Sequence, residues 1–305
     1  MGKIEFGVAL PAVTGIAEFA RRAEELGFDF LACGEHVMFH GPVTNTFIAL
    51  SVAAGVTRRI KLLSSVVLLP LYPAALAAKM GAVLDVASGG RYHFGVGIGG
   101  EFPKEFEACG VPVTQRGART NEALEVITRL WTEKNVAFEG RFTKLSGVTI
   151  DPPPVQKPRP PIWVAGRKEP AMRRAARYAD GWIPYMYTPQ QLRDSVETIA
   201  RFRQEYGKDM STFTPGLFIF SAVHANGDEA RQMAAERLGR QYAQDFSTLV
   251  NKYALAGTPE ECRKRLQEYV DAGARMVILP SACRPEYLDE NMRLLVQEVL
   301  PAFRQ

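Results

Sequence analysis

Short apolar segments alternate with amphipathic segments along the whole chain of 305 residues. Residues 4–10 form the first apolar run, and apolar side chains then recur at helical spacing over 16–26 until Gly27 ends the helix. The alternation continues along the chain and is typical of a parallel sheet covered by helices. The predicted strands cover residues 4–10, 28–33, 60–69, 91–96, 162–165, 181–185, 216–223 and 275–280.

Amphipathic helices are predicted between these strands. Two of them begin with the same signal, in which Thr188 or Thr258 precedes a proline and is followed three residues later by Gln191 or Glu261. This is the sequence pattern of a capping box. The other predicted helices cover residues 16–26, 46–56, 74–87, 122–132, 171–179 and 286–299, and a long helical insertion covers 228–253.

Two segments depart from this alternation. Residues 136–150 alternate around a central glycine, Gly140, and predict a hairpin. Residues 151–161 are rich in proline, which excludes a central strand or a helix. This run could be a linker between domains, but the strand and helix alternation resumes at Ile162, so we interpret it as a rigid surface loop.

The number of strands and the length of the chain favour one α/β domain over residues 1–305. Barrels of alternating strands and helices commonly reach this length as one domain. We expect a (β/α)8 TIM barrel with a helical insertion after strand seven. An open, doubly wound sheet is the alternative.

Composition and charge narrow the function classes. The net charge of +4 is small and the basic residues are scattered, which argues against a nucleic-acid surface and for an anionic small ligand. The N-terminus lacks the pattern of a signal peptide, and two prolines interrupt the longest uncharged run, so we expect no membrane span and a cytoplasmic protein. No two cysteines have the spacing of a metal site or of a redox motif, so we expect no cysteine metal site. The four cysteines, which we expect to be free thiols, are Cys33, Cys109, Cys262 and Cys283.

The residues after predicted strand two are the first candidates for chemistry. Glu35 and His36 follow this strand, and strand ends of this kind form the catalytic mouth of a barrel. Histidine titrates near neutral pH, so His36 could hydrogen-bond or protonate a reacting group. Glu35 could orient His36 or contact a ligand. A capped or core histidine is the structural alternative.

Two further strand ends predict cofactor contacts. Predicted strand four ends in a glycine-rich run that includes Gly97 and Gly99 and formally satisfies G-x-G-x-x-G. A dinucleotide site would need a helix to open inside the motif, in the first strand–helix unit of the chain, so we interpret this run as bare backbone that a planar ligand can approach. A tight turn would give the same sequence.

Predicted strand five is followed by Ala165, Gly166, Arg167 and Lys168, just before a helix. Free N–H groups at a helix start bind phosphate, and basic side chains add charge. A solvated basic turn is the alternative. The motifs of zinc proteases, nucleotide hydrolases and serine esterases are not present in the sequence.

Taken together, these segments resemble the bacterial-luciferase-like family of flavin- and deazaflavin-dependent oxidoreductases. The likeness covers nearly the whole chain and depends on the order and spacing of several motifs. They are Gly34-Glu35-His36-Val37, residues 60–67 with Tyr72-Pro73, residues 95–100, Glu105-Phe106-Glu107-Ala108-Cys109-Gly110-Val111, residues 161–166, Ala179-Asp180-Gly181-Trp182 and residues 256–261.

The resemblance implies a (β/α)8 barrel with an insertion after strand seven and hydride transfer through a flavin ring across the barrel mouth. The Glu35-His36 pair looks like the branch that uses coenzyme F420, a deazaflavin, although FMN with a partner reductase remains open. Ser65-Val66 matches a non-proline cis peptide behind the ring in such members. Gly166, Arg167 and Lys168 would bind the cofactor phosphate, but many relatives have Ser or Thr there.

Three functions follow as hypotheses. The first is an F420-dependent oxidoreductase that acts on a small organic substrate, with His36 and Glu35 at the cofactor. The second is an FMN-dependent two-component monooxygenase that uses reduced flavin and O2, and the third is a barrel that binds a ligand without turnover. We also expect a homodimer. Candidate substrate contacts, for which ordinary packing is the alternative, are Glu101, Phe102, Trp182, Tyr185 and Tyr187.

Overall fold

Eight parallel strand positions form a closed barrel in a computed structural model that describes residues 3–304. The sheet has nine strands, but β4 (Val67–Leu68) only continues β3 beyond Ser65-Val66, which leaves eight positions. Pairing of β3 with β5 and of β1 with β13 closes the ring. This closure confirms the barrel and excludes an open sheet. The eight are β1 (Glu5–Ala9), β2 (Phe30–Cys33), β3 (Lys61–Ser64), β5 (Tyr92–Gly97), β8 (Ile162–Ala165), β9 (Gly181–Ile183), β10 (Thr214–Phe218) and β13 (Met276–Ile278).

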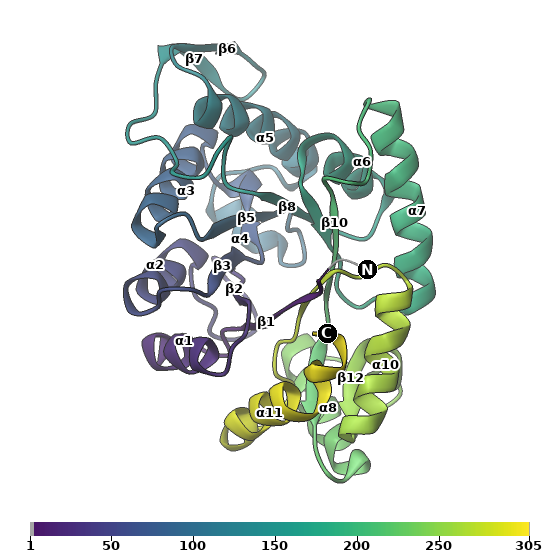
Figure 1. Ribbon diagram of the computed structural model, residues 1–305. Helices are drawn as coiled ribbons and strands as arrows, with labels where there is room; N and C mark the ends of the chain where they lie inside the picture. Colours follow the sequence, from purple (N-terminus) through teal and green to yellow (C-terminus); the bar gives the residue numbers. More distant parts are fainter. Residues whose placement is uncertain (1–2, 305) are drawn as a thin grey trace.

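The helices surround the barrel, as Figure 1 shows. Both predicted capping boxes are confirmed, at Thr188 before α7 and at Thr258 before α10. The short helix α4 (Pro103–Ala108) was not predicted. The covering helices are α1 (Ile16–Glu25), α2 (Thr46–Val56), α3 (Ala74–Ser88), α5 (Arg116–Thr132), α6 (Glu169–Tyr178), α7 (Pro189–Glu205), α10 (Pro259–Asp271) and α11 (Leu288–Leu294).

The prediction of a single strand seven over 216–223 is wrong. The barrel strand β10 ends at Phe218, and the chain then forms β11 (Phe220–Val223), which pairs with the unpredicted β12 (Ala254–Gly257) outside the barrel. Between β11 and β12 lie two helices, α8 (Gly227–Tyr242) and α9 (Val250–Tyr253). The predicted continuous helix is interrupted after α8, where Ala243 adopts a left-handed backbone conformation with φ 51°.

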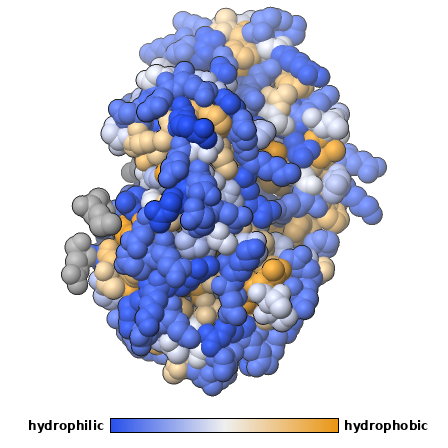
Figure 2. Space-filling view, turned by 90° about the vertical axis from the view of Figure 1, so that its right-hand side faces the viewer, coloured by the Kyte–Doolittle hydropathy of each residue, from blue (hydrophilic) through white to orange (hydrophobic). Residues whose placement is uncertain are grey.

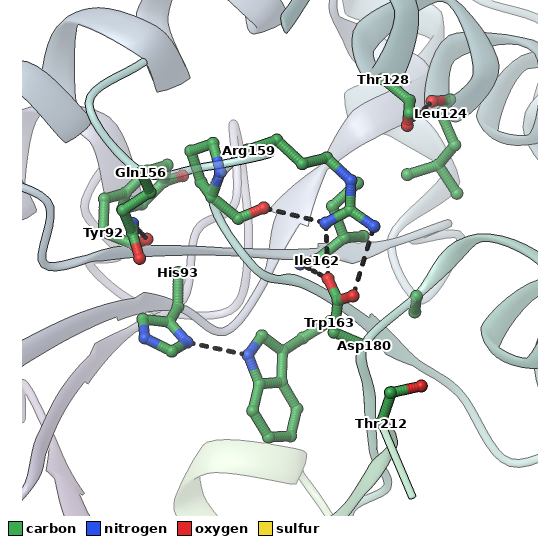
Figure 3. A network of polar contacts seen from close by, with 12 residues as sticks. Tyr92, His93, Leu124, Thr128, Gln156, Arg159, Ile162, Trp163, Asp180 and Thr212 are labelled. Carbon is green, nitrogen blue, oxygen red and sulfur yellow. Dashed lines mark hydrogen bonds and ion pairs between the residues drawn. The ribbon is translucent and has the colours of Figure 1, made fainter. Parts of the chain in front are cut away.

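Two other segments match the sequence predictions. β6 (Val136–Glu139) and β7 (Lys144–Val148) form the expected antiparallel hairpin. The proline-rich run is a mostly exposed loop that Gln156 fastens to the barrel. The side-chain amide of Gln156 donates to the Asp85 carboxylate at 2.7 Å and to the carbonyl of Tyr92, beside it in Figure 3, at 2.7 Å. Predicted strand three is interrupted at Ser65-Val66, which is a cis peptide, as the family resemblance implied.

The barrel interior is a separate apolar cluster that also contains a polar contact between Trp163 and His93. Side chains from alternate strand positions fill it, as in other barrels of this type. The indole nitrogen of Trp163 donates to Nδ1 of His93 at 3.1 Å (Figure 3). Burial lowers the pKa of His93 from 6.5 to about 3, because a charged imidazole is poorly solvated there. The apolar members of the cluster are Phe30, Ala32, Leu63, Trp163, Ile183, Met276 and Ile278.

This buried histidine predicts a pH dependence of stability. Between pH 6.5 and about 3, the unfolded chain binds a proton at His93 that the folded chain does not, so stability falls as the pH falls through this window. His93→Gln keeps an acceptor for Trp163 and removes the titration. We expect the unfolding free energy of the variant to fall less steeply with decreasing pH than that of wild type. The difference between the two slopes should be up to about 1.4 kcal/mol per pH unit.

Urea unfolding at several pH values measures this slope. His40→Gln is the matched control, because His40 is exposed. Equal slopes for wild type and His93→Gln would contradict the prediction.

Candidate active site

A cavity of about 690 Å³ opens at the C-terminal ends of the barrel strands. Its walls come from the segments after β1, β2, β3, β5, β8, β9, β10 and β13, and from the end of α8. This is the face on which (β/α)8 enzymes carry their active sites. Of the candidate residues, the cavity wall contains Glu35, His36, Ser65, Val66, Gly97, Gly99, Glu101, Ala165, Gly166, Arg167, Lys168 and Tyr185.

His36 lies in the cavity wall and is held from two sides. Its Nδ1 atom is 3.2 Å from both carboxylate oxygens of Glu105, and the ring of Phe39 stacks on its imidazole at 4.2 Å. Glu105 also accepts the Val37 N–H at 3.1 Å and is fully buried. Sequence reasoning missed this carboxylate as a site residue, although it occurs in one of the family motifs.

Glu35 has a different environment from the one expected. Its carboxylate is buried and accepts hydrogen bonds from the backbone of Leu68 and Thr46 and from the side chains of Asn45 and Tyr72. Burial is the main influence on this group and raises its pKa. The contact with His36 belongs to Glu105. The structure therefore corrects the expectation that Glu35 orients His36, because Glu35 instead ties β2 to β4 and α2.

Glycines bring backbone close to the cavity floor. A Cβ atom on Gly97 would lie 2.5 Å from Cγ2 of Val66, and one on Gly34 would lie 2.9 Å from the carbonyl oxygen of Ser65. Larger residues at either position would displace the Ser65-Val66 peptide. The floor is therefore mainly backbone and small apolar surface, which suits a flat ligand.

The loop at the start of α6 presents free backbone donors. Gly166 has φ 126°, and across residues 3–304 the N–H groups of Arg167 and Lys168 donate to no protein acceptor. The Arg167 guanidinium lies 4.9 Å from the ring centre of Tyr185. Positive side chains and free donors at a helix start together favour an anion such as phosphate.

Two predicted substrate contacts, Trp182 and Tyr187, support this loop from behind and do not line the cavity. The indole of Trp182 donates to the Gly166 carbonyl at 2.8 Å, and the Tyr187 hydroxyl donates to the Arg167 carbonyl at 2.9 Å. Both side chains are buried in the layer between the strands and the helices. The expectation that they contact substrate is corrected, because strand alternation points Trp182 away from the barrel axis.

The other predicted substrate contacts lie near the rim. The Tyr185 hydroxyl donates a hydrogen bond to the Glu101 carboxylate. The pKa of the Tyr185 phenol is raised, mainly by burial and secondly by the Glu101 carboxylate. Phe102 packs edge-on against Phe39 and His40 and is not part of the cavity wall. The structure thus keeps Glu101 and Tyr185 as candidates and moves Phe102 to a supporting position.

Sequence reasoning also missed two arginines of the insertion. Arg237 and Arg240 lie on the last turns of α8 and line the cavity. Burial raises the pKa of the Tyr242 phenol, and the positive charges of Arg237 and Arg167 both oppose this rise. Their helix is rich in charges of both signs, so no local pattern distinguishes these two from solvent-exposed neighbours.

A family model described as luciferase-like monooxygenase matches residues 5–276. The chain belongs to the luciferase-like monooxygenase family. The members of this family are oxidoreductases and monooxygenases, so this luciferase-like chain is an enzyme.

Two cofactor classes occur among the relatives of this luciferase-like protein. The F420-dependent glucose-6-phosphate dehydrogenase of Microbacterium testaceum is 25% identical over 95% of this chain and 93% of its own length. The FMNH2-dependent dimethylsulfone monooxygenase of Pseudomonas putida is 29% identical over 67% of this chain and 56% of its own length. The structure of monooxygenase RslO1 from Streptomyces bottropensis superposes with a TM-score of 0.88 at 27% identity, over 98% of this chain and 100% of that one.

Other relatives have names that describe no function. An uncharacterized protein of Mycobacterium tuberculosis is 35% identical over 55% of this luciferase-like chain, and the match spans 57% of the mycobacterial protein. Among residues 3–304, no helix has the length and apolar character needed to cross a bilayer.

Proposed function

We propose that this luciferase-like enzyme uses coenzyme F420 to transfer a hydride to or from a small organic substrate. The observation that carries the proposal is a group of four basic side chains on the cavity wall. Within the described part of the chain, none of the four forms an ion pair with a carboxylate. The four, called the basic group below, are Arg167, Lys168, Arg237 and Arg240.

The basic group bears on the choice of cofactor. F420 and FMN share a tricyclic ring and a ribityl phosphate, so the floor and the α6 loop suit both. F420 carries an additional anionic tail beyond the phosphate. Arg237 and Arg240 add two positive charges to those of Arg167 and Lys168, and unpaired cations at a cavity favour an anionic ligand.

The residues present fit a cofactor of this kind. Gly97, Val66 and Ser65 would lie against its ring, since they form the flat floor, and the N–H groups of Arg167 and Lys168 would hold its phosphate. A bound deazaflavin supplies the two-electron chemistry, because its ring accepts or donates a hydride.

His36 supplies the proton chemistry in this proposal. Its Nδ1 atom is engaged by Glu105, so Nε2 remains for a hydrogen bond to a polar atom of the substrate. His36 would hold the proton that accompanies hydride transfer. Phe39 fixes the plane of the imidazole, and apolar side chains after β1 and on β10 and β11 exclude water from the remaining volume.

An FMN-dependent two-component monooxygenase is the second candidate. The similarity to the monooxygenases of Pseudomonas putida and Streptomyces bottropensis favours it. Such an enzyme would receive reduced flavin from a reductase and consume O2. A binding protein without turnover, the third candidate, would show neither hydride transfer nor oxygen consumption.

Fluorescence-quenching titrations with F420 and FMN test the proposal. We expect tighter binding of F420, and we expect salt to weaken F420 binding more than FMN binding, because exposed charges are screened. Replacing Arg237 and Arg240 together by glutamine should weaken F420 binding by up to about 30-fold, if each contact contributes roughly 0–1 kcal/mol.

The matched control is Arg21→Gln with Arg193→Gln, which makes the same change of charge on exposed helix surfaces. It should leave both affinities unchanged. Tighter binding of FMN at both salt concentrations, with no difference in salt dependence, would make the FMN monooxygenase the better assignment.

We also propose that two copies pair through α2 and α3. The helix α2 contains no charged residue, and α3 packs beside it. The side with α6, α7 and α10 is mostly hydrophilic, as Figure 2 shows. The exposed surface of these two helices carries one charged side chain, Lys79, which donates to the Asp151 carbonyl, so two copies can meet about a twofold axis with little opposition of like charges. The exposed apolar side chains on these helices are Ile48, Val52, Leu76, Val83 and Val86.

Light scattering measures this association. Wild type should have the mass of a dimer, and Ile48→Glu should have that of a monomer, because a paired face would bury its carboxylate. Arg193→Glu on α7 is the control and should stay dimeric. A monomeric wild type at micromolar concentration would contradict the pairing.

A further inference from the structure

We infer that Glu105 is a positioning residue that keeps the proton of neutral His36 on Nδ1 and leaves Nε2 as the acceptor in the cavity. The geometry is specific. Both carboxylate oxygens lie 3.2 Å from Nδ1, and the side chain of Glu105 is fully buried. An ionised carboxylate only accepts hydrogen bonds, so the nitrogen facing it must carry the hydrogen.

His36 is the only cationic or potentially cationic partner of Glu105 within residues 3–304. The Glu105 carboxylate also accepts a hydrogen bond from the Val37 N–H, at 3.1 Å. The titratable groups that face the pair are Glu35 and Cys109, and neither can supply a positive charge. A buried carboxylate without hydrogen-bond donors would be costly, so Glu105 depends on the Nδ1–H group of His36 and on the Val37 N–H group.

The pair also joins two parts of the cavity wall. His36 follows β2, whereas Glu105 lies on α4, which follows the glycine-rich end of β5. Phe39 restricts the imidazole plane, with an angle of 17° between the two rings. Glu105 and Phe39 together therefore fix which ring nitrogen faces the substrate and in which direction, as second partners of functional histidines commonly do.

Histidine-selective ¹⁵N labelling measures the tautomer directly. The chain has four histidines, so the His36 signals can be assigned by comparison with His36→Gln. We expect the Nδ1–H form in wild type and a loss of this preference in Glu105→Gln, whose amide can donate or accept. Glu105→Asp should retain the preference in part. Glu107→Gln, an exposed neighbour on α4, is the control and should match wild type.

Turnover gives a second measurement and rests on the proposed function. With the cofactor that the titrations identify, Glu105→Gln should lower kcat by roughly 10–100-fold with little change in KM. Glu105→Asp should recover part of the loss. An effect on KM alone would assign Glu105 to substrate binding and overturn the inference.

The two measurements separate the possible failures. An Nε2–H tautomer of His36 in wild type would overturn the inference without any variant of Glu105, even if Glu105→Gln failed to fold. If neither F420 nor FMN bound, the proposed function would fail while the tautomer measurement still decided the role of Glu105.

Discussion

Replacing His36 by alanine is expected to lower turnover by roughly 10²–10⁴-fold, the usual contribution of a positioned acid or base. Cofactor affinity should change far less. The floor at Gly97 and Val66 and the N–H groups at the start of α6 do not involve the imidazole. The measurement is kcat from steady-state assays beside Kd from fluorescence titration.

His224→Ala is the control for this variant, because His224 follows β11, does not line the cavity, and has no bond to Glu105. It should keep most of the wild-type turnover. If His36→Ala turned over at the wild-type rate, His36 would be a packing residue and the proton would have to come from another group, with Tyr185 the next candidate.

The second large effect is expected from Gly95→Ala. A Cβ atom at this position would lie 1.9 Å from the carbonyl oxygen of Ser64, which is backbone and cannot rotate away. The Ser64 hydroxyl accepts a hydrogen bond from the Gly95 N–H at 2.8 Å and donates one to the Gly95 carbonyl at 3.0 Å. The strands β3 and β5 therefore cannot separate here without losing both hydrogen bonds. We expect a loss of more than about 3 kcal/mol of unfolding free energy, or no folded protein.

Gly55→Ala is the matched control, because no atom lies within 4 Å of a Cβ atom at this exposed position in α2. It should stabilise the protein by about 0.5–1 kcal/mol, the usual gain for alanine over glycine in a helix. Urea unfolding and soluble yield measure both variants. A folded Gly95→Ala with wild-type stability would show that β3 and β5 can move apart at no cost.

The barrel was predictable because each strand and helix carries its own local pattern. The capping boxes at Thr188 and Thr258 are short-range signals and were found where the sequence placed them. The departure of β11 from the barrel was not predictable in this way. Residues 216–223 form one apolar run, and only pairing with a distant segment, β12, divides it after Phe218.

The same distinction explains the outcome at the site. The position of His36 follows from its strand, whereas its partner Glu105 comes from another loop 69 residues away. Strand alternation alone specifies the orientation of Trp182. Ile183 faces the barrel interior and Tyr185 the cavity, so Trp182 between them must face the helices. Arg237 and Arg240 depended on how the insertion folds over the cavity, which no local pattern specifies.

The β6–β7 hairpin gives this enzyme a natural attachment point for a sensor. It connects α5 to β8, so it lies at the N-terminal ends of the strands, on the opposite side from the cavity. The exposed residue Ser146 on β7 could carry a dye or a surface linker there. An immobilised molecule would then present its open cavity to solution. Repeated additions of substrate could be followed on the same immobilised sample.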